Sequence, residues 1–306
     1  MVRAKKIVIL NLPGSFQTAV SGLAEFFSLA NSIGGKDLLK FSVLDTKAFK
    51  ELKNDQIDYL IVPPVIDKKV YLNPDKKVLE KIKKLFKKKA TICSVCSGAF
   101  IVASSGILTS ESVTTHWEME REFKEMFPKH SVNTDEILIN NGKIIFAGGL
   151  MAWTDLAFHI IKRNFNKKII HELGHLLVMN TSPREQRRYK KFNVDLNHPD
   201  LEVKKCQTYI NKNYRLSITL SDLESHVNLT NRTLIRRFVR ATGLTPLKYI
   251  QSIKIQKACE LLESTNQAIE EVAHDMGYED VGSFRKIFIQ KMGVGPKEFR
   301  QMYGEK

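Results

Sequence analysis

The sequence predicts an α/β domain, built on a parallel sheet sandwiched by helices, followed by an all-α domain with two helix-turn-helix units. Over residues 5–185, short apolar runs alternate with helical patterns, which is typical of a parallel sheet that helices cover on both faces. Residues 201–302 contain helical patterns and no convincing strand. This change of pattern predicts two domains.

Continuous apolar runs predict the buried strands of the first domain. They occur at residues 7–12, 41–45, 58–64 and 90–96. A further β-rich segment covers 131–149, and an Asn-Gly step within 139–145 predicts a hairpin turn. Among the intervening helical patterns, the lysine-rich segment 76–89 is interpreted as an amphipathic helix with a solvated basic face.

Composition places the chain among folded globular proteins. Its hydrophobic content is 43% and its formal net charge is +15, and a strongly basic chain favours polyanionic partners, nucleic acid first. No apolar run approaches the roughly 18–20 residues of a membrane helix, and the first one is too short for a secretory signal. Four cysteines in 306 residues do not make a disulfide framework. We expect a cytoplasmic protein with no membrane partner.

A polar and basic stretch separates the two domains. It reads "SPREQRRYKKFNVDLNHPD" over 182–200, contains two prolines and lacks an apolar period. We therefore expect the first domain at 5–185, a linker at 186–203 and the second domain at 204–303.

The second domain repeats itself at an offset of fifty residues. The repeat aligns "TLIRRFVRATGLTPLKYIQ" (233–251) with "SFRKIFIQKMGVGPKEFRQ" (283–301). Upstream, with a one-residue slip, Asn228 and Gly277 stand at a tight turn, and both residue types tolerate the left-handed conformation. Each repeat predicts one helix-turn-helix unit, at about 219–241 and about 268–291.

The repeat also carries the motif of a known family. The motif residues are Ala273, Gly277, Tyr278, Asp280, Phe284, Phe288, Gly293 and Pro296. On them, the segment 204–303 resembles the DNA-binding domain of the AraC/XylS family. Glu224, where alanine is usual, and Asn228, where glycine is common, are mild departures. The resemblance implies a transcriptional regulator that binds double-stranded promoter DNA and is nucleoid-associated when bound.

Two helices, at about 230–241 and 280–291, are the expected recognition helices, which would enter successive major grooves. An arginine fork matches the O6 and N7 atoms of guanine. Arg237 and Arg240 are expected to contact phosphate or solvent. The candidates for contact with base edges are Arg232, Thr233, Arg236, Ser283, Arg285 and Lys286.

The run "TICSVCSGAF" places Cys96 at a strand end, directly before Ser97 and a helix. This order predicts an elbow in which N–H groups at the helix start can lower a thiol pKa. With "VTTHW" and "FAGG…TDLAFH", the segment 5–185 resembles the flavodoxin-like, class I glutamine amidotransferase-like fold in its PfpI-like branch. More narrowly, it is similar to the sensor half of GlxA-type AraC regulators. The resemblance implies a homodimer and a small-molecule effector, and it makes RNA polymerase a candidate partner.

The residues around Cys96 argue against catalysis. A cysteine hydrolase of this fold needs a histidine and a carboxylate near the thiol. His116 could approach Cys96, but the residue after the cysteine is Ser97 rather than the histidine of PfpI-type peptidases. In the family's D-x-x-G-P pattern, Ala19 replaces the aspartate and Leu23 the proline. We expect a vestigial elbow, with no enzyme activity and no cofactor. The alternative is a PfpI-like cysteine-dependent amidase or hydrolase with an auxiliary DNA-binding domain.

The cleft beside the elbow is the expected effector site. A metabolite bound there would change the pairing or orientation of the DNA-binding domains and so promoter occupancy. The expected lining residues are Gly14, Ser15, Cys96, Ser97, His116 and Trp117.

Residues 171–175 read HELGH, the H-E-x-x-H string of zinc metalloproteases. The extended metzincin pattern needs glycine at 178 and histidine at 181, where this chain has Val178 and Thr181. We therefore expect no metal site. The segment fits instead the last helix of the first domain, with five apolar residues facing inward: Ile169, Ile170, Leu173, Leu176 and Leu177.

Overall fold

The computed structural model describes residues 3–53, 56–182, 184–192 and 194–304. It divides into two compact units, Met1–Gln186 and Arg187–Lys306. Pro183, at the end of the expected first domain, and Asn193, in the expected linker, lie outside the described residues.

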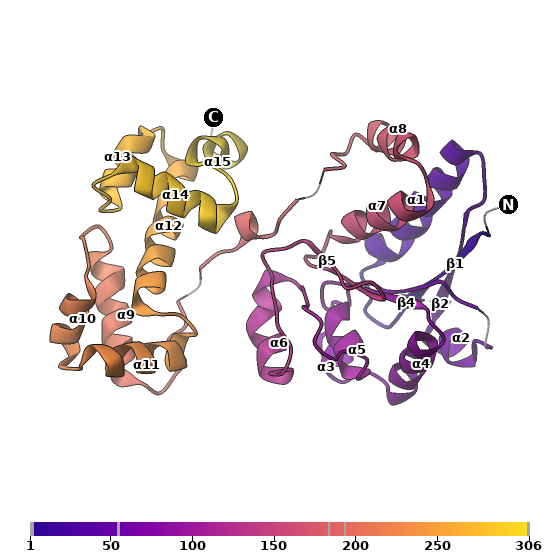
Figure 1. Ribbon diagram of the computed structural model, residues 1–306, viewed down its shortest axis with the longest axis horizontal. Coiled ribbons are helices and arrows are strands. Elements are labelled where there is room, and N and C mark those ends of the chain that lie inside the picture. Colours follow the sequence, from indigo (N-terminus) through magenta and orange to yellow (C-terminus); the bar gives the residue numbers. More distant parts are fainter. Residues whose placement is uncertain (1–2, 54–55, 183, 193, 305–306) are drawn as a thin grey trace. The chain divides into compact units, whose positions relative to one another are not determined.

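The described part of the first unit contains a six-stranded sheet with the order β2-β1-β3-β4-β6-β5. Helices cover both of its faces (Figure 1). Neighbouring strands are parallel, except that β5 and β6 form an antiparallel hairpin. This parallel-dominated sheet confirms the predicted fold class, and the hairpin lies where the Asn-Gly step predicts it. The strands are β1 (Lys5–Asn11), β2 (Leu39–Asp45), β3 (Tyr59–Val62), β4 (Thr91–Val95), β5 (Leu138–Asn140) and β6 (Ile144–Ala147).

Alternate residues of the central strands supply a hydrophobic core on each face of the sheet, because successive side chains of a strand point to opposite faces. Ile7 and Ile9 of β1 belong to one core and Val8 and Leu10 to the other. The first core includes residues of α1 (Gln17–Gly34), α7 (Trp153–Asn164) and α8 (Lys167–Leu177). The second includes residues of α2 (Thr46–Glu51), α3 (Lys68–Leu72), α4 (Lys76–Lys87), α5 (Gly98–Ser104) and α6 (Glu120–Met126), the last preceded by a short 3₁₀ turn, η1 (Trp117–Met119).

The described part of the second unit is helical, as the sequence predicts. A 3₁₀ turn, η2 (Arg187–Tyr189), is followed by seven helices: α9 (Leu201–Asn213), α10 (Leu220–Val227), α11 (Asn231–Thr242), α12 (Pro246–Ser264), α13 (Ile269–Asp275), α14 (Val281–Met292) and α15 (Pro296–Tyr303). Helix α9 begins at Leu201, three residues before the expected domain start at 204.

Two separate cores hold the two helix-turn-helix units. One packs α9, α10 and α11, and the other packs α13, α14 and α15. The long helix α12 enters both, with Ile250 and Ile253 in the first and Ile255 and Leu262 in the second. Both predicted helix-turn-helix units are therefore confirmed, and α12 connects them (Figure 1).

The turns of the two units use the residues that the repeat indicates. Asn228 ends α10 in the left-handed conformation, with φ of 51°. Gly277 occupies the equivalent turn with φ of 69°, and a Cβ atom added there would lie 2.3 Å from the carbonyl oxygen of Arg215. The second turn therefore requires glycine for both backbone conformation and space. In the described parts of the chain, no helix combines the length and apolarity of a membrane span.

Candidate nucleic-acid interface and elbow site

Helix α11 presents a row of arginines on the side away from its core. Leu234 and Phe238 are buried, whereas Arg232, Arg236 and Arg240 are exposed at successive turns of the helix. Residues four apart lie on one helical face. The sequence indicates Arg232 and Arg236 as candidates for base contact and places Arg240 apart from them. In the structure all three lie on the same exposed face.

Thr233 lies next to this row and is half-buried. Its hydroxyl accepts a hydrogen bond from the hydroxyl of Thr230, the residue before α11, over 3.1 Å. The bond fixes the first turn of the helix, where a recognition helix contacts base edges.

Arg237 corrects the expectation from the sequence, which placed it with the phosphate or solvent contacts. Its guanidinium binds the carboxylate of Asp200, with Nη2 2.6 Å from Oδ1 and Nε 2.8 Å from Oδ2. The hydrogen bonds from Arg237 hold the pKa of Asp200 below its usual value. Arg237 is one position beyond the arginine row, so it points toward α9 and ties the two helices together.

Helix α14 repeats the arrangement with fewer cations. Phe284 and Phe288 are buried, while Ser283, Arg285 and Lys286 are exposed. Arg285 donates to Glu270 over 2.7 Å, and both side chains are about half exposed. Exposed pairs of this kind contribute only about 0–1 kcal/mol, so the Arg285 guanidinium is readily exchanged to another anion.

The predicted elbow is present at Cys96. This residue has φ of 53° between the end of β4 and the start of α5, a strained conformation for a residue other than glycine. Gly98, two residues later, begins α5 close to β3: a Cβ atom added to it would lie 2.6 Å from the carbonyl oxygen of Val62. The backbone of Cys96 is held on both sides, by its N–H to the Ala147 carbonyl and by its carbonyl to the Thr115 hydroxyl, each over 2.8 Å.

The thiol of Cys96 does not have the lowered pKa that the elbow motif suggests. The residue is 4% exposed, and burial raises the pKa of the thiol to about 12. The backbone N–H groups of Ser97 and His116 lower the pKa, but their effect is smaller than that of burial. Desolvation of the thiolate therefore dominates at this site.

His116 acts locally in the described structure. Its Nδ1 accepts a hydrogen bond from the backbone N–H of Glu118 over 3.3 Å and so caps η1. Burial lowers the pKa of His116, which favours the neutral ring that can accept this bond. Trp117 lies beside it, with ring centroids 5.4 Å apart.

The six expected effector-site residues divide into two groups. Ser15, Cys96 and Ser97 are buried, and Gly14, His116 and Trp117 are exposed or half-buried. The Ser97 hydroxyl donates to the carbonyl of Val65 and accepts from its N–H, each over 2.7 Å. The Ser15 hydroxyl accepts from the N–H of Leu12. Both hydroxyls are therefore committed to the protein backbone.

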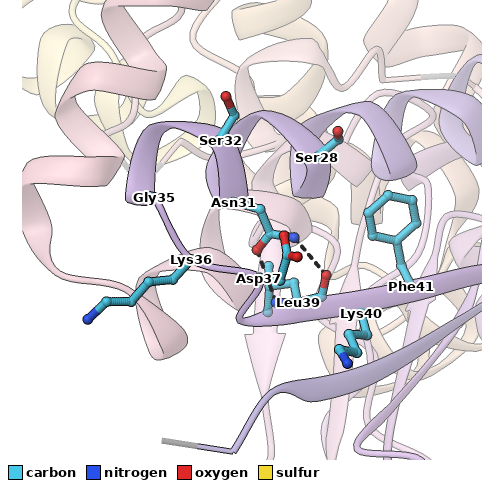
Figure 2. Close-up of a pocket in the computed structure, with 9 residues that line it drawn as sticks. All are labelled: Ser28, Asn31, Ser32, Gly35, Lys36, Asp37, Leu39, Lys40 and Phe41. Carbon is cyan, nitrogen blue, oxygen red and sulfur yellow. Dashed lines mark hydrogen bonds between the residues drawn. The ribbon is translucent and has the colours of Figure 1, made fainter. Parts of the chain in front are cut away.

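Two hollows in the first unit lie away from these residues. One, of about 670 Å³, lies between the end of α1 and the start of β2 (Figure 2). It is at the amino end of the parallel strands, whereas ligands of such sheets bind at the carboxyl ends. The other, of about 230 Å³, is lined by residues of β5 and α7, among them His159 and Lys162, and by residues 180–182 and Arg184.

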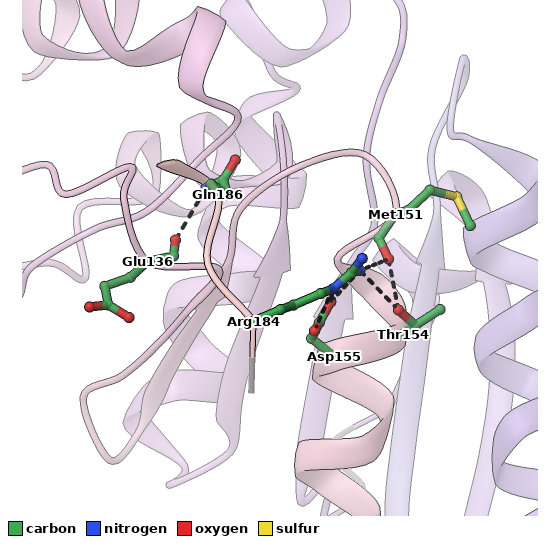
Figure 3. A network of polar contacts seen from close by, with 6 residues as sticks. All are labelled: Glu136, Met151, Thr154, Asp155, Arg184 and Gln186. Atoms are coloured by element: carbon green, nitrogen blue, oxygen red, sulfur yellow. Dashed lines mark hydrogen bonds and ion pairs between the residues drawn. The ribbon is translucent and has the colours of Figure 1, made fainter. Parts of the chain in front are cut away.

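Sequence reasoning missed the roles of Arg184, which lines this second hollow, and of Gln186, which follows it in the chain. Arg184 forms a two-point ion pair with Asp155 of α7, with Nη2 2.7 Å from Oδ2 and Nε 2.9 Å from Oδ1 (Figure 3). Gln186 is 2% exposed. These residues stand at the start of the stretch that composition marks as a linker, and nothing in a polar stretch signals which of its side chains becomes buried.

The HELGH string forms part of α8, as expected. His171 and His175 are exposed, with their Nε2 atoms 3.0 Å apart. Among the described residues, no group of three or more His, Cys, Asp or Glu is arranged to hold a metal ion. One expectation is corrected: Leu176 is 58% exposed, because the inward stripe passes through Ile169 and Leu173 and leaves it at the rim.

Comparisons with known proteins match a different family in each part of the chain. Residues 28–163 match the DJ-1/PfpI family, and residues 223–302 match a helix-turn-helix domain. The HTH-type transcriptional regulator GbdR of Pseudomonas aeruginosa is 26% identical over 211 residues, which are 68% of this chain and 57% of GbdR. The matched region thus spans little more than half of that relative.

Two further likenesses cover one domain or part of the chain. The HTH-type transcriptional regulator YfiF of Bacillus subtilis is 34% identical over 144 residues, 45% of each chain. The crystal structure of Drosophila melanogaster DJ-1beta is similar with a TM-score of 0.50 at 14% identity, over 58% of this chain and 99% of that one. The last likeness concerns the fold alone.

Fold and comparisons together define a two-domain protein in which a DJ-1/PfpI-like α/β domain precedes a double helix-turn-helix domain. The first domain is thus similar to the DJ-1/PfpI family and the second to helix-turn-helix domains, and curated relatives that share part of this chain are named HTH-type transcriptional regulators.

Proposed function

We propose that this protein is a transcriptional regulator that binds promoter DNA through α11 and α14 and responds to a small molecule through its first domain. The observation that carries the proposal is the exposed face of α11, where Arg232, Arg236 and Arg240 follow one another at successive turns. They lie on the second helix of a helix-turn-helix unit, which is the helix that enters the major groove.

Helix α14 is the second recognition helix in this proposal. Ser283, Arg285 and Lys286 are exposed there, and Asp280 fixes the start of the helix by accepting from the N–H groups of Gly282 and Ser283. Two such helices on one domain would read two successive major grooves. The net charge of +15 supports the phosphate contacts that supply most of the affinity for DNA.

The first domain acts in this proposal as a sensor rather than as an enzyme. The buried thiol of Cys96, with its pKa raised to about 12, would be almost wholly protonated near neutral pH, and the thiolate is the nucleophile. Ser97, which stands where related peptidases carry a histidine, is committed to Val65. A homodimer, a cytoplasmic location with nucleoid association when DNA is bound, and contact with RNA polymerase complete the proposal.

Selection from random-sequence DNA duplexes tests the DNA-binding part. The full chain should enrich a site with two short motifs about one helical turn apart. Arg236→Ala should weaken binding to this site, while Lys168→Ala, which removes a charge on α8 of the first unit, should leave it unchanged. Absence of any enriched motif would contradict the proposal.

One observation keeps the alternative of a cysteine-dependent amidase or hydrolase testable, namely the strained elbow at Cys96. Turnover of amide and ester substrates by the purified chain, abolished in Cys96→Ser, would establish an added catalytic role. An unchanged baseline in both proteins, with DNA binding intact, agrees with a sensor.

A further inference from the structure

A polar slot in the first unit is filled by a side chain from the segment that leads into the second unit. The carboxamide nitrogen of Gln186 donates hydrogen bonds to three oxygens that line this slot. They are the Thr115 carbonyl at 2.9 Å, the Glu136 carbonyl at 3.1 Å and the Thr114 hydroxyl at 3.1 Å. We call this site, completed by Gly148, the amide slot.

Gly148 gives the amide slot its depth. A Cβ atom added to Gly148 would lie 1.8 Å from Nε2 of Gln186 and 2.8 Å from the Thr114 hydroxyl. The Gly148 φ angle is not in the left-handed region, so the backbone conformation does not demand glycine here. What demands it is the side chain of Gln186 lying against it.

The acceptors of the amide slot are suited to a nitrogen that carries N–H bonds. The Thr114 hydroxyl already donates its proton to the Glu136 carbonyl over 2.8 Å, so all three oxygens of the slot accept from the occupant. Gln186 serves them imperfectly, since its Oε1 is buried without a hydrogen-bond partner. An unpaired buried acceptor costs roughly 1–3 kcal/mol. A free carboxamide can turn its oxygen elsewhere because it is not tethered to the chain, and a primary ammonium has no such oxygen.

The amide slot is connected to both functional regions. Thr115, whose carbonyl accepts from Gln186, also donates through its hydroxyl to the carbonyl of Cys96 at the elbow. On the other side, the next residue along the chain is Arg187, which donates to the carbonyl of Gln290 in α14 over 3.2 Å. One peptide bond therefore separates a side chain fixed in the first unit from one fixed on a proposed recognition helix.

The segment around Gln186 is attached at two further points in the first unit. The Gln186 N–H donates to the Asp135 carbonyl over 2.8 Å, and Arg184 pairs with Asp155. Figure 3 shows the two side chains pointing in opposite directions, Gln186 toward Glu136 and Arg184 toward Asp155. We call residues 184–186 the strap. It is attached to the first unit at the amide slot through Gln186 and at Asp155 through Arg184.

We propose that the amide slot is a recognition site for an N–H-donating head group, a primary carboxamide or a primary ammonium, and that Gln186 occupies it as a tethered ligand. An effector with such a head group displaces Gln186, frees the strap and thereby changes the constraint on α14. The regulatory half of this inference rests on the proposed function. The existence of the slot and its occupation by Gln186 do not depend on the proposed function.

Release of the strap is measured by limited trypsin digestion of the full chain, because Arg184, Arg187 and Arg188 are cleavage points in or next to it. Gln186→Glu keeps the shape of the side chain but places a carboxylate against three acceptor oxygens. Cleavage at these arginines should become about tenfold faster, as expected when a buried hydrogen-bonded group is replaced by an unpaired one. The matched control is Gln301→Glu, the same substitution at an exposed position of α15, which should cleave as the wild type does.

Gly148→Ala tests the same slot from the opposite wall. Its methyl group expels Gln186, so the variant should also be cleaved faster, and combining it with Gln186→Glu should add little. Rates that multiply would show that the two substitutions act independently and would overturn the proposal. So would an unchanged rate in Gln186→Glu.

Chemical rescue identifies the head group. Gln186→Ala empties the slot, and a small molecule that binds there raises the Tm of the full-length variant by mass action. Propionamide and ethylammonium should each be tried, and at least one should raise the Tm, whereas propionate, which has the shape of propionamide without N–H donors, should not. The effect should vanish in Gln186→Ala combined with Gly148→Ala. No rise with either donor, or an equal rise with propionate, would overturn the proposal.

These experiments need no DNA, so they separate the two proposals. Failure to find a DNA site would remove the proposed regulator and leave the rescue result standing. Conversely, normal DNA selection together with failed rescue would remove only the tethered ligand.

Discussion

The guanidinium of Arg237 and the carboxylate of Asp200 form a two-point ion pair, with distances of 2.6 and 2.8 Å. Asp200 also accepts from the N–H of Val203 and so caps α9. One carboxylate thus starts a helix and fixes its contact with α11. An arginine on a proposed recognition helix serves the stability of the domain, while its neighbour Arg236 remains exposed.

Arg237→Ala should therefore reduce stability more than specificity. The pair is partly exposed, so we expect a loss of at most about 1 kcal/mol in the free energy of unfolding. Urea denaturation of the variant measures this loss. Arg240→Ala removes an exposed arginine of the same helix and should leave the urea midpoint unchanged.

The same pair predicts a pH dependence. The pKa of Asp200 is lowered in the folded state, chiefly by its hydrogen bond from Arg237, so the unfolded chain binds the proton more readily. The stabilisation is present above the unfolded pKa of about 3.9 and is lost as the pH falls through the folded value. Between pH 6 and pH 3 the wild type should lose more stability than Arg237→Ala. Parallel curves would show that the pair makes no contribution.

Arg236 and Arg240 should differ in the kind of DNA affinity they supply. If Arg236 contacts a base, Arg236→Ala should cost about 1–3 kcal/mol at one base position and relax the preference there. Arg240, at the far end of the exposed row, should contact phosphate, so that Arg240→Ala weakens all sequences alike and lowers the salt dependence by about one ion. Fluorescence anisotropy with single-base variants of the selected site distinguishes the two, and a uniform loss in Arg236→Ala would reassign it to phosphate.

Cys96 should resist thiol reagents in the folded protein. Its pKa of about 12 leaves roughly one thiolate in 10⁴ at pH 8, and burial restricts access as well. Iodoacetamide labelling followed by peptide mass spectrometry should modify Cys96 only after denaturant is added. Cys93, buried in β4, serves as the internal control. Fast labelling of Cys96 but not of Cys93 in native buffer would indicate a reactive elbow and would favour the enzymatic alternative.

Two glycines of the second domain separate backbone strain from steric exclusion. Gly243 and Gly277 have φ of 74° and 69°, but a Cβ meets nothing within 4 Å at Gly243 and an oxygen at 2.3 Å at Gly277. Gly243→Ala should cost about 1 kcal/mol from conformation alone. Gly277→Ala should cost clearly more, because the Arg215 carbonyl is part of the backbone and cannot rotate away. Equal losses of stability in thermal denaturation would contradict this reading.

Local patterns were sufficient for the order and type of the main elements. The apolar runs at 7–12 and 90–96 correspond to β1 and β4, and the fifty-residue repeat corresponds to the paired helix-turn-helix units. These features depend on periodic burial and turn chemistry, which neighbouring residues determine. The elbow at Cys96 was also visible, because a strand, a cysteine and a helix follow directly in sequence.

The sequence by itself therefore determined the two domains, their fold classes and the helices that carry the exposed arginines. Only the tertiary structure decided what individual polar residues do. It assigned Arg237 to Asp200, raised the pKa of Cys96 through burial, and placed Gln186 in a slot formed by residues 38 to 72 positions earlier in the chain. The physical reason is that desolvation and hydrogen-bond partners come from distant segments, which no local pattern encodes.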